Sequence, residues 1–216
     1  MKTINAKEKG LKEVSQKLRG SLNGENITVK NASHLHGFAA GLKHGEVVID
    51  GDAGDYFGAL NDGAILQVTK NVGNYAADNM TAGTIIIEGN ADYGAGQYCY
   101  GGTVVIRGDA GDFSATMNKG AAVIIGGNVG HEAATYMIKG DLVVVGDAGE
   151  NFANFLIRGS VYIGGKWKSL GHNTREEPMS DEDIAKLREY FETFNIDADP
   201  KKFTKIVAAS EKPFYK

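Results

Sequence analysis

The sequence predicts a right-handed parallel β-helix, an all-β solenoid of 19-residue coils that is capped by short N- and C-terminal helices. Two observations lead to this prediction. Thirty of the 216 residues are glycine, about twice the usual share, and only three are proline, so the glycines do not belong to a disordered Pro/Gly tract. The glycines also recur with a fixed period, which is typical of repeat architectures.

The repeat keeps its register across seven turns. Its clearest copies are GEVVIDGDAG (45–54), GTVVIRGDAG (102–111) and GDLVVVGDAG (140–149), and a degenerate copy fits at 26–44. Counting from Gly51 to Gly165, every nineteenth residue is glycine, with Lys70 as the exception. A unit this short excludes a βαβ unit, which needs about 30 residues, and a WD40 blade of about 40–45 residues. One coil of a parallel β-helix fits it.

Each copy contains one strand with a constant inward face. The first position of the repeat is glycine in five copies and alanine in two, Ala64 and Ala121. The second and fourth residues after it are aliphatic in every copy, and residues two apart on a strand share a face. We therefore expect two core columns: Val47, Leu66, Ile85, Val104, Val123, Leu142 and Val161, and Ile49, Val68, Ile87, Ile106, Ile125, Val144 and Ile163.

The residue between these two columns should point outward, yet it is mostly apolar. This outer ladder reads Val48, Gln67, Ile86, Val105, Ile124, Val143 and Tyr162. A continuous apolar patch on a surface has to be covered. The sequence leaves two possibilities for what covers this patch. One is a terminal helix of the same chain, and the other is another subunit or a second copy of this chain.

An Asp/Asn column follows each strand and predicts a turn. Its members are Asp52, Asn71, Asn90, Asp109, Asn128 and Asp147, with glycine two residues later in most copies. Asx and glycine residues support tight turns through local side-chain hydrogen bonds and positive φ angles. A ladder of calcium ions is the alternative, but turn formation alone accounts for the column.

The two ends of the chain predict caps. We expect an N-terminal helical cap in residues 1–25, with the helix within 6–19, and the β-helix in residues 26–168. Residues 169–216 should form a C-terminal helix over 181–194, with Ser180 as its N-cap, followed by an extended tail (201–216) lying along a surface.

The sequence shows no motif for chemistry of its own. Neither GxSxG, GxxxxGK[ST] nor GxGxxG occurs, so we assign no catalytic, cofactor-binding or metal residue. His34 and His36 form one metal-like pair without a third ligand, and we expect them to be structural. His131 reads as a turn residue. Cys99 is the only cysteine, and we expect it to be an inert thiol. A single cysteine cannot form an internal disulfide or a CxxC-type zinc site.

Composition limits the partners and the location. The net charge is −4, which gives no sign of nucleic-acid or membrane binding. The first residues contain no apolar secretory segment, and no run reaches the roughly 18 apolar residues of a membrane span. We therefore expect a cytoplasmic protein.

The repeat GxVVIxGDAGDxxG resembles the GXGXG domain at the C-terminal end of the glutamate synthase large subunit, over about residues 20–172. Residues 18–42 are similar to the beginning of that domain, and GDAGDYFGALNDG (51–63) is similar to its first full coil. The C subunit of formylmethanofuran dehydrogenase has related coils. The short chain, the segment YIGGKWKSLGHNT (162–174) and the helical tail look more like the stand-alone form of the domain, while Lys70 departs from the pattern.

This resemblance implies a non-catalytic structural and docking subunit of a glutamate-synthase-like oxidoreductase complex. The implied partners are a glutamine amidotransferase and an FMN-domain subunit. FMN and iron–sulfur clusters would belong to those partners, with no cofactor bound by this chain, and homo-oligomers remain open. The alternative is the equivalent β-helical component of a formylmethanofuran dehydrogenase-type complex. An independent enzyme, for example an esterase, lacks a nucleophile, base and orienting group in the sequence.

Overall fold

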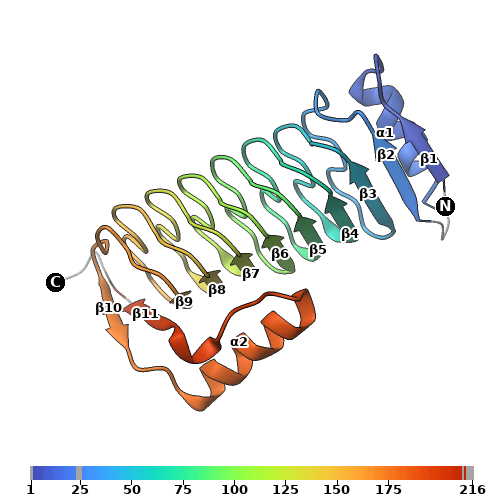
Figure 1. Cartoon of the computed structure of the whole chain (residues 1–216). Helices are drawn as coiled ribbons and strands as arrows, with labels where there is room; N and C mark the ends of the chain where they lie inside the picture. The colour runs from blue at the N-terminus through green and yellow to red at the C-terminus, as the bar shows by residue number, and fades with distance from the viewer. Residues whose placement is uncertain (1, 23–25, 211, 213–216) are drawn as a thin grey trace.

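A computed structural model describes residues 2–22, 26–210 and 212. The chain forms a β-solenoid of about seven turns (Figure 1), which confirms the predicted fold. Each coil contributes one strand to an 11-stranded sheet. The parallel strands of the coils are β2 (Ile27–Lys30), β3 (Glu46–Asp50), β4 (Asp62–Val68), β5 (Ala82–Ile87), β6 (Thr103–Ile106), β7 (Lys119–Ile125), β8 (Lys139–Val144) and β9 (Ser160–Ile163).

The strand register confirms the 19-residue period from β3 onward. Val47 pairs with Leu66, and Leu66 pairs with Ile85, each exactly one repeat further along the chain. The first coil is longer, because Ile27 pairs with Val47 rather than with Glu46. The first coil therefore spans 20 residues, one more than the 19-residue copy expected at 26–44.

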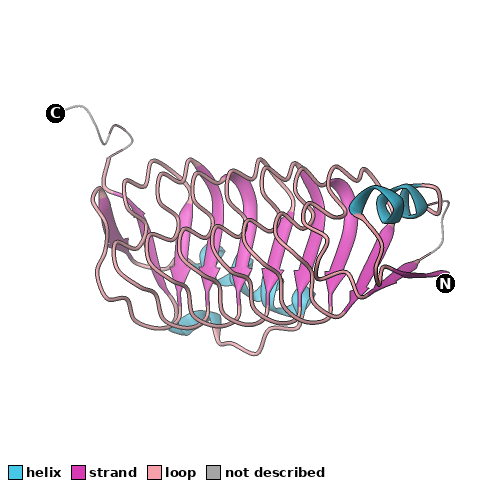
Figure 2. Cartoon of the chain, turned by 90° about the horizontal axis from the view of Figure 1, so that it is seen from above, coloured by secondary structure: helices cyan, strands magenta, loops and turns pink. Residues whose placement is uncertain are grey.

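The predicted inward columns form the core of the solenoid. All 14 side chains of the two columns are at most 1% exposed. A second line of parallel bridges runs opposite them through small residues, for example Ala91 to Ala110 and Ala110 to Val129. Figure 2 shows the strands behind the stacked loops of the coils. Small side chains on the second line let the two walls of each coil approach closely, so the core is narrow and fully packed.

The Asp/Asn column connects coils, which corrects the local turn expected from the sequence. The Asn90 Oδ1 atom accepts a hydrogen bond from the backbone N–H of Asp109 (2.9 Å), and the Asp109 Oδ1 atom accepts from Asn128 N–H (2.7 Å). The same bond recurs along the column from Asp52 to Lys166. Each side chain thus binds the equivalent backbone position one coil further on.

This ladder explains the glycines that precede the column. A Cβ atom at Gly108 would collide with the Asn90 Oδ1 atom, and one at Gly127 would collide with the Asp109 Oδ1 atom. The side chain of one coil occupies the space that a Cβ of the next coil would need. Close packing between coils, rather than a positive φ angle, therefore selects glycine at these two positions.

The N-terminal cap contains the predicted helix and a strand that the sequence analysis did not predict. Helix α1 (Leu11–Arg19) buries Val14 and Leu18, which confirms a helix within 6–19. Strand β1 (Lys2–Asn5) precedes it and pairs in parallel with β2. Four residues with only one buried side chain, Ile4, give too little pattern to identify a strand from the sequence.

The C-terminal helix α2 (Asp181–Phe194) matches the predicted range and N-cap. The Ser180 side chain accepts from the Asp183 N–H and the Asp183 side chain accepts from the Ser180 N–H, a complete capping box. After α2, a 3₁₀ turn, η1 (Pro200–Lys202), leads into β11.

The tail is part of the sheet, which corrects the expectation that it lies along a surface. Strand β11 (Thr204–Ala208) inserts between β9 and β10 (Thr174–Glu177) and pairs antiparallel with both. Ile206 is fully buried there, so β11 closes the C-terminal end of the core. The last part of the expected tail, residues 211 and 213–216, lies outside the described residues. Within the described part of the chain, no helix is long and apolar enough to cross a membrane.

We predict that Ile106→Asp prevents cooperative folding, whereas Thr84→Asp does not. Ile106 is fully buried, and an unpaired buried carboxylate costs several kcal/mol. Thr84 is only partly buried, and its outward column already holds Glu46 and Asp141, so its substitution should change stability by less than about 1 kcal/mol. Urea unfolding followed by circular dichroism measures both, and equal destabilisation would contradict the assigned strand facing.

Candidate docking surfaces

The predicted outer apolar ladder is covered by the chain's own C-terminal region over four coils. Leu187 and Phe191 of α2, together with Phe203, form one buried cluster with the ladder. The ladder residues in this cluster are Val105, Ile124, Val143 and Tyr162, each at most 1% exposed. Figure 1 shows α2 lying across the strands on this side of the solenoid. The sequence left two covers open, and for these coils the cover is a terminal helix of the same chain.

A buried polar network fixes the start of α2 to the sheet. The Tyr162 Oη atom donates a hydrogen bond to Asp183 Oδ1 (2.6 Å), and Lys205 Nζ lies 3.0 Å from Asp183 Oδ2. Burial alone would raise the pKa of Asp183, but hydrogen bonds from Tyr162, Ser180 and Lys205 hold that pKa well below its usual range. Asp183 therefore stays ionised and joins three elements: β9, β11 and α2.

A second set of contacts fixes the rest of the helix. Tyr190 Oη donates to Asp141 Oδ2 (2.8 Å), and Lys186 Nζ lies 3.2 Å from Asp141 Oδ1. At the far end of α2, Arg107 Nη1 donates to the carbonyl oxygen of Phe194 (2.9 Å). A cation that binds the last carbonyls of a helix also interacts favourably with the helix dipole.

Beyond α2, polar side chains replace the apolar ladder. Arg107 Nε lies 2.7 Å from Glu88 Oε2, and Gln67 Nε2 donates to Glu88 Oε1 (2.9 Å). This chain of contacts runs over β6, β5 and β4 where the cover ends. The remaining ladder residues, Val48 and Ile86, are half-buried. Gln67 lies between them in the ladder, so the uncovered part of the sheet face has no continuous apolar ladder.

The loop face of the solenoid carries the exposed apolar surface instead. We define the aromatic row as Tyr56, Tyr75, Tyr93 and Phe113, which lie on consecutive coils. Consecutive ring centroids are 4.8, 5.5 and 5.1 Å apart. Tyr56 is 43% exposed and Tyr93 is 39% exposed. The loops lie on the side of the solenoid that α2 does not cover (Figures 1 and 2).

Three members of the row adopt an unusual backbone conformation. Tyr56, Tyr75 and Phe113 have φ angles of 55°, 60° and 60°, in the left-handed region that costs roughly 1–2 kcal/mol for a residue with a side chain. The coil between the last two has Gly94 in the same column, also at positive φ. Glu132 and Asn151 continue this column with φ angles of 59° and 54°, so the left-handed conformation belongs to the coils and does not depend on an aromatic side chain.

More apolar and aromatic surface lies next to the aromatic row. Leu60 is 58% exposed and Tyr100 is 55% exposed. Lys119 Nζ lies 4.1 Å from the Tyr100 ring centroid and 2.8 Å from the Tyr100 hydroxyl oxygen, a cation–π geometry. Burial raises the pKa of Tyr93, and the neighbouring Tyr75 and Asp112 raise it further, so its hydroxyl remains protonated at neutral pH.

The histidines singled out from the sequence do not converge on one site. His34 and His36 lie in a turn rather than on a strand. His34 Nε2 contacts the carbonyl oxygen of Lys9 (2.9 Å), whereas His36 Nδ1 accepts from the Asp55 N–H (3.1 Å). His131 Nδ1 accepts from the Glu150 N–H one coil on (3.0 Å). Among the described residues, no three His, Cys, Asp or Glu side chains are placed to hold a metal ion.

Cys99 is a core residue. It is fully buried, its Sγ atom contacts the carbonyl oxygen of Ala77 (3.0 Å), and burial raises the pKa of its thiol to about 12. The reactive form of cysteine is the thiolate, which this burial disfavours. The buried position of Cys99 agrees with the inert thiol expected from the sequence.

Family comparison agrees with the coil pattern. Residues 34–212 match the GXGXG motif family. The chain belongs to the GXGXG family. Domains of this family are found in glutamate synthase-type enzymes, as the repeat suggested. No curated protein sequence matches this GXGXG chain.

The sequence analysis missed the aromatic row although a signal was present. Tyr56, Tyr75 and Phe113 share the 19-residue register, but the search for columns followed aliphatic residues and glycines. Tyr93 lies one position outside the register, and only the structure shows that its ring contacts both Tyr75 and Phe113.

We predict that α2 of this GXGXG protein loosens below about pH 4. The folded-state pKa of Asp183 is depressed, so its stabilising effect is complete above the ordinary value of 3.8 and is lost as the pH falls toward the depressed value. Hydrogen-exchange protection of residues 181–194 should fall about tenfold between pH 6 and pH 3.

The variant Asp183→Asn tests whether Asp183 is the group responsible. It should lower protection of α2 already at pH 6, because Lys205 keeps Glu177 but loses its charged partner on α2. It should also remove most of the difference between the two pH values. Wild-type protection that is equal at pH 6 and pH 3 would contradict the assignment.

Proposed function

We propose that this chain is a non-catalytic docking subunit of a glutamate-synthase-like oxidoreductase complex. Its partners would be a glutamine amidotransferase and a flavoprotein that carries FMN and iron–sulfur clusters. Membership in the GXGXG family supports the class of complex. The single observation that supports a docking role is the aromatic row, a partly exposed run of aromatic rings in contact with one another on consecutive coils.

The composition of the loop face suits a protein interface. Interface centres are enriched in tyrosine and other aromatic residues, and most binding free energy comes from a few such side chains. The rings of the aromatic row already contact one another, so few side-chain rotamers would be lost on binding, which lowers the entropic cost of association. Asp78 and Gln97, joined by a hydrogen bond of 3.0 Å, would belong to a polar rim.

The redox and transfer chemistry would belong to the partners. An iron–sulfur cluster is typically held by about four cysteine thiolates, and this chain has only Cys99, which is buried in the core. The residues of this chain do not fit such a cluster. In our proposal the solenoid supplies a rigid surface of fixed length on which catalytic subunits are positioned.

Affinity purification of the tagged protein from its native cell, followed by mass spectrometry, tests the proposal. We expect recovery of a glutamine amidotransferase and a flavoprotein. The double variant Tyr56→Ser/Tyr93→Ser should reduce that recovery about tenfold or more, since truncation of a central interface aromatic typically costs more than about 1 kcal/mol.

Ile65→Ser is the matched control, because Ile65 is 46% exposed but lies on β4 rather than on the loop face. It should leave recovery unchanged. Recovery of the chain without any partner would overturn the proposed function. Partners that bind the tyrosine variant as strongly as the wild type would overturn the assigned surface.

A further inference from the structure

Among the described residues, the N-terminal end of the sheet presents an open strand edge. Strand β1 is the first strand in the sheet order and pairs with β2 on one side. The N–H groups of Lys2 and Ala6 donate to β2, to the carbonyl oxygens of Asn26 and Lys30. Alternate residues of a strand direct their backbone groups to opposite edges. The N–H and C=O groups of Thr3 and Asn5 therefore face away from the solenoid.

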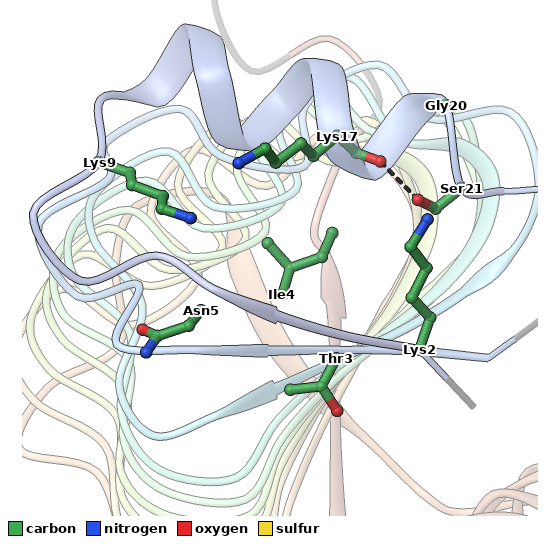
Figure 3. Close-up of a pocket in the computed structure, with 8 residues that line it drawn as sticks. All are labelled: Lys2, Thr3, Ile4, Asn5, Lys9, Lys17, Gly20 and Ser21. Atoms are coloured by element: carbon green, nitrogen blue, oxygen red, sulfur yellow. Dashed lines mark hydrogen bonds between the residues drawn. The ribbon is translucent and has the colours of Figure 1, made fainter.

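A hollow of about 450 Å³ lies along this edge, between β1 and α1. Figure 3 shows Lys2 and Ile4 directed toward α1 and Thr3 directed away from it. Lys9 and Lys17 line the α1 side of the same hollow. A strand added beside β1 would place every second side chain in this hollow, next to Ile4 and the three lysines.

The charge of the chain is concentrated at this end. Residues 1–20 contain five lysines and one arginine but only two glutamates, a net charge of +4. The whole chain carries −4, which leaves −8 for residues 21–216. Glu13 pairs with both Lys17 (2.7 Å) and Lys9 (3.8 Å), so one carboxylate serves two ammonium groups and the hollow remains positive.

We propose that this end binds an extended acidic segment of a partner protein by β-strand addition to β1. The open N–H and C=O groups of Thr3 and Asn5 would form the backbone ladder. Carboxylates at alternate positions of the segment would meet Lys2, Lys9 and Lys17. Backbone pairing supplies affinity in this binding mode, and the side chains directed into the hollow supply specificity. This interface is separate from the aromatic row and does not depend on the proposed function.

The charges favour such a partner over a second copy of this chain. Two copies joined through β1 would bring like charges together. The opposite edge of the sheet, β10, carries Arg175 as well as Glu176 and Glu177, and Arg175 Nη2 already pairs with Glu177 Oε2 (2.7 Å). An edge with both signs of charge discourages pairing, so β10 is a poor complement for the uniformly positive hollow.

A fluorescent peptide of four Glu-Thr repeats is a suitable probe, because its carboxylates fall on one face of a strand. Fluorescence anisotropy with the full chain should show binding that weakens with salt and exceeds that of a Lys-Thr peptide at least tenfold. Thr3→Pro removes a donor at the open edge without removing a bond to β2, a position where strands tolerate proline. It should reduce binding at least tenfold, whereas Thr3→Val should not.

The charge contribution is tested by Lys9→Gln/Lys17→Gln, with Lys12→Gln on the exposed part of α1 as control. The double variant should weaken peptide binding about fivefold and the control should have no effect. Equal binding of the acidic and basic peptides, or full binding by a folded Thr3→Pro variant, would overturn the proposal. Self-association of the wild type that Thr3→Pro abolishes would overturn it in favour of a second copy.

Discussion

The structure depends on one constraint: each coil must place the same backbone groups directly against those of the next. One 19-residue repeat returns the chain to the same point of the perimeter, so strands pair in register and the turn column bonds from coil to coil. Backbone contact at this distance leaves no room for a Cβ atom at Gly108 or Gly127. Sequence period, glycine content and core packing therefore all follow from the inter-coil ladder.

The solenoid has a sheet face, a loop face and two ends, and these surfaces differ in how far other parts of the chain cover them. Over β6 to β9 the sheet face is covered by α2, which rests on Val105, Ile124 and Val143 and is fixed by the buried Asp183 network. The loop face keeps exposed rings that no part of the described chain covers completely. The two ends differ as well, because β11 closes the C-terminal core while β1 leaves a positive strand edge. The loops and the N-terminal end are therefore the two surfaces on which our proposals of partner binding rest.

The aromatic row distinguishes the loop face, whereas the backbone conformation of this face does not. The column that holds Tyr56, Tyr75 and Phe113 continues with Glu132 and Asn151, which also have positive φ angles. The left-handed conformation therefore belongs to the coils whatever the side chain, and the specific feature of this surface is the contact between partly exposed rings. Exposed aromatic rings support a docking role without reference to catalysis, in agreement with a GXGXG domain found in glutamate synthase-type enzymes.

The sequence by itself determined the coil. Its period, inward columns and both helices follow from interactions repeated at fixed spacing, and the capping signals around Ser180 are local. Only the tertiary structure decided which surface is covered, because α2 reaches Val105 from a distant part of the chain and no periodic signal encodes that contact. The same holds for β11, whose place beside β9 depends on the path of the chain after α2, and for Tyr93, which joins the aromatic row from outside the register. A repeated interaction can be recognised from the sequence because it recurs at a fixed spacing. A contact between segments that do not repeat depends on long-range packing and is seen only in the tertiary structure.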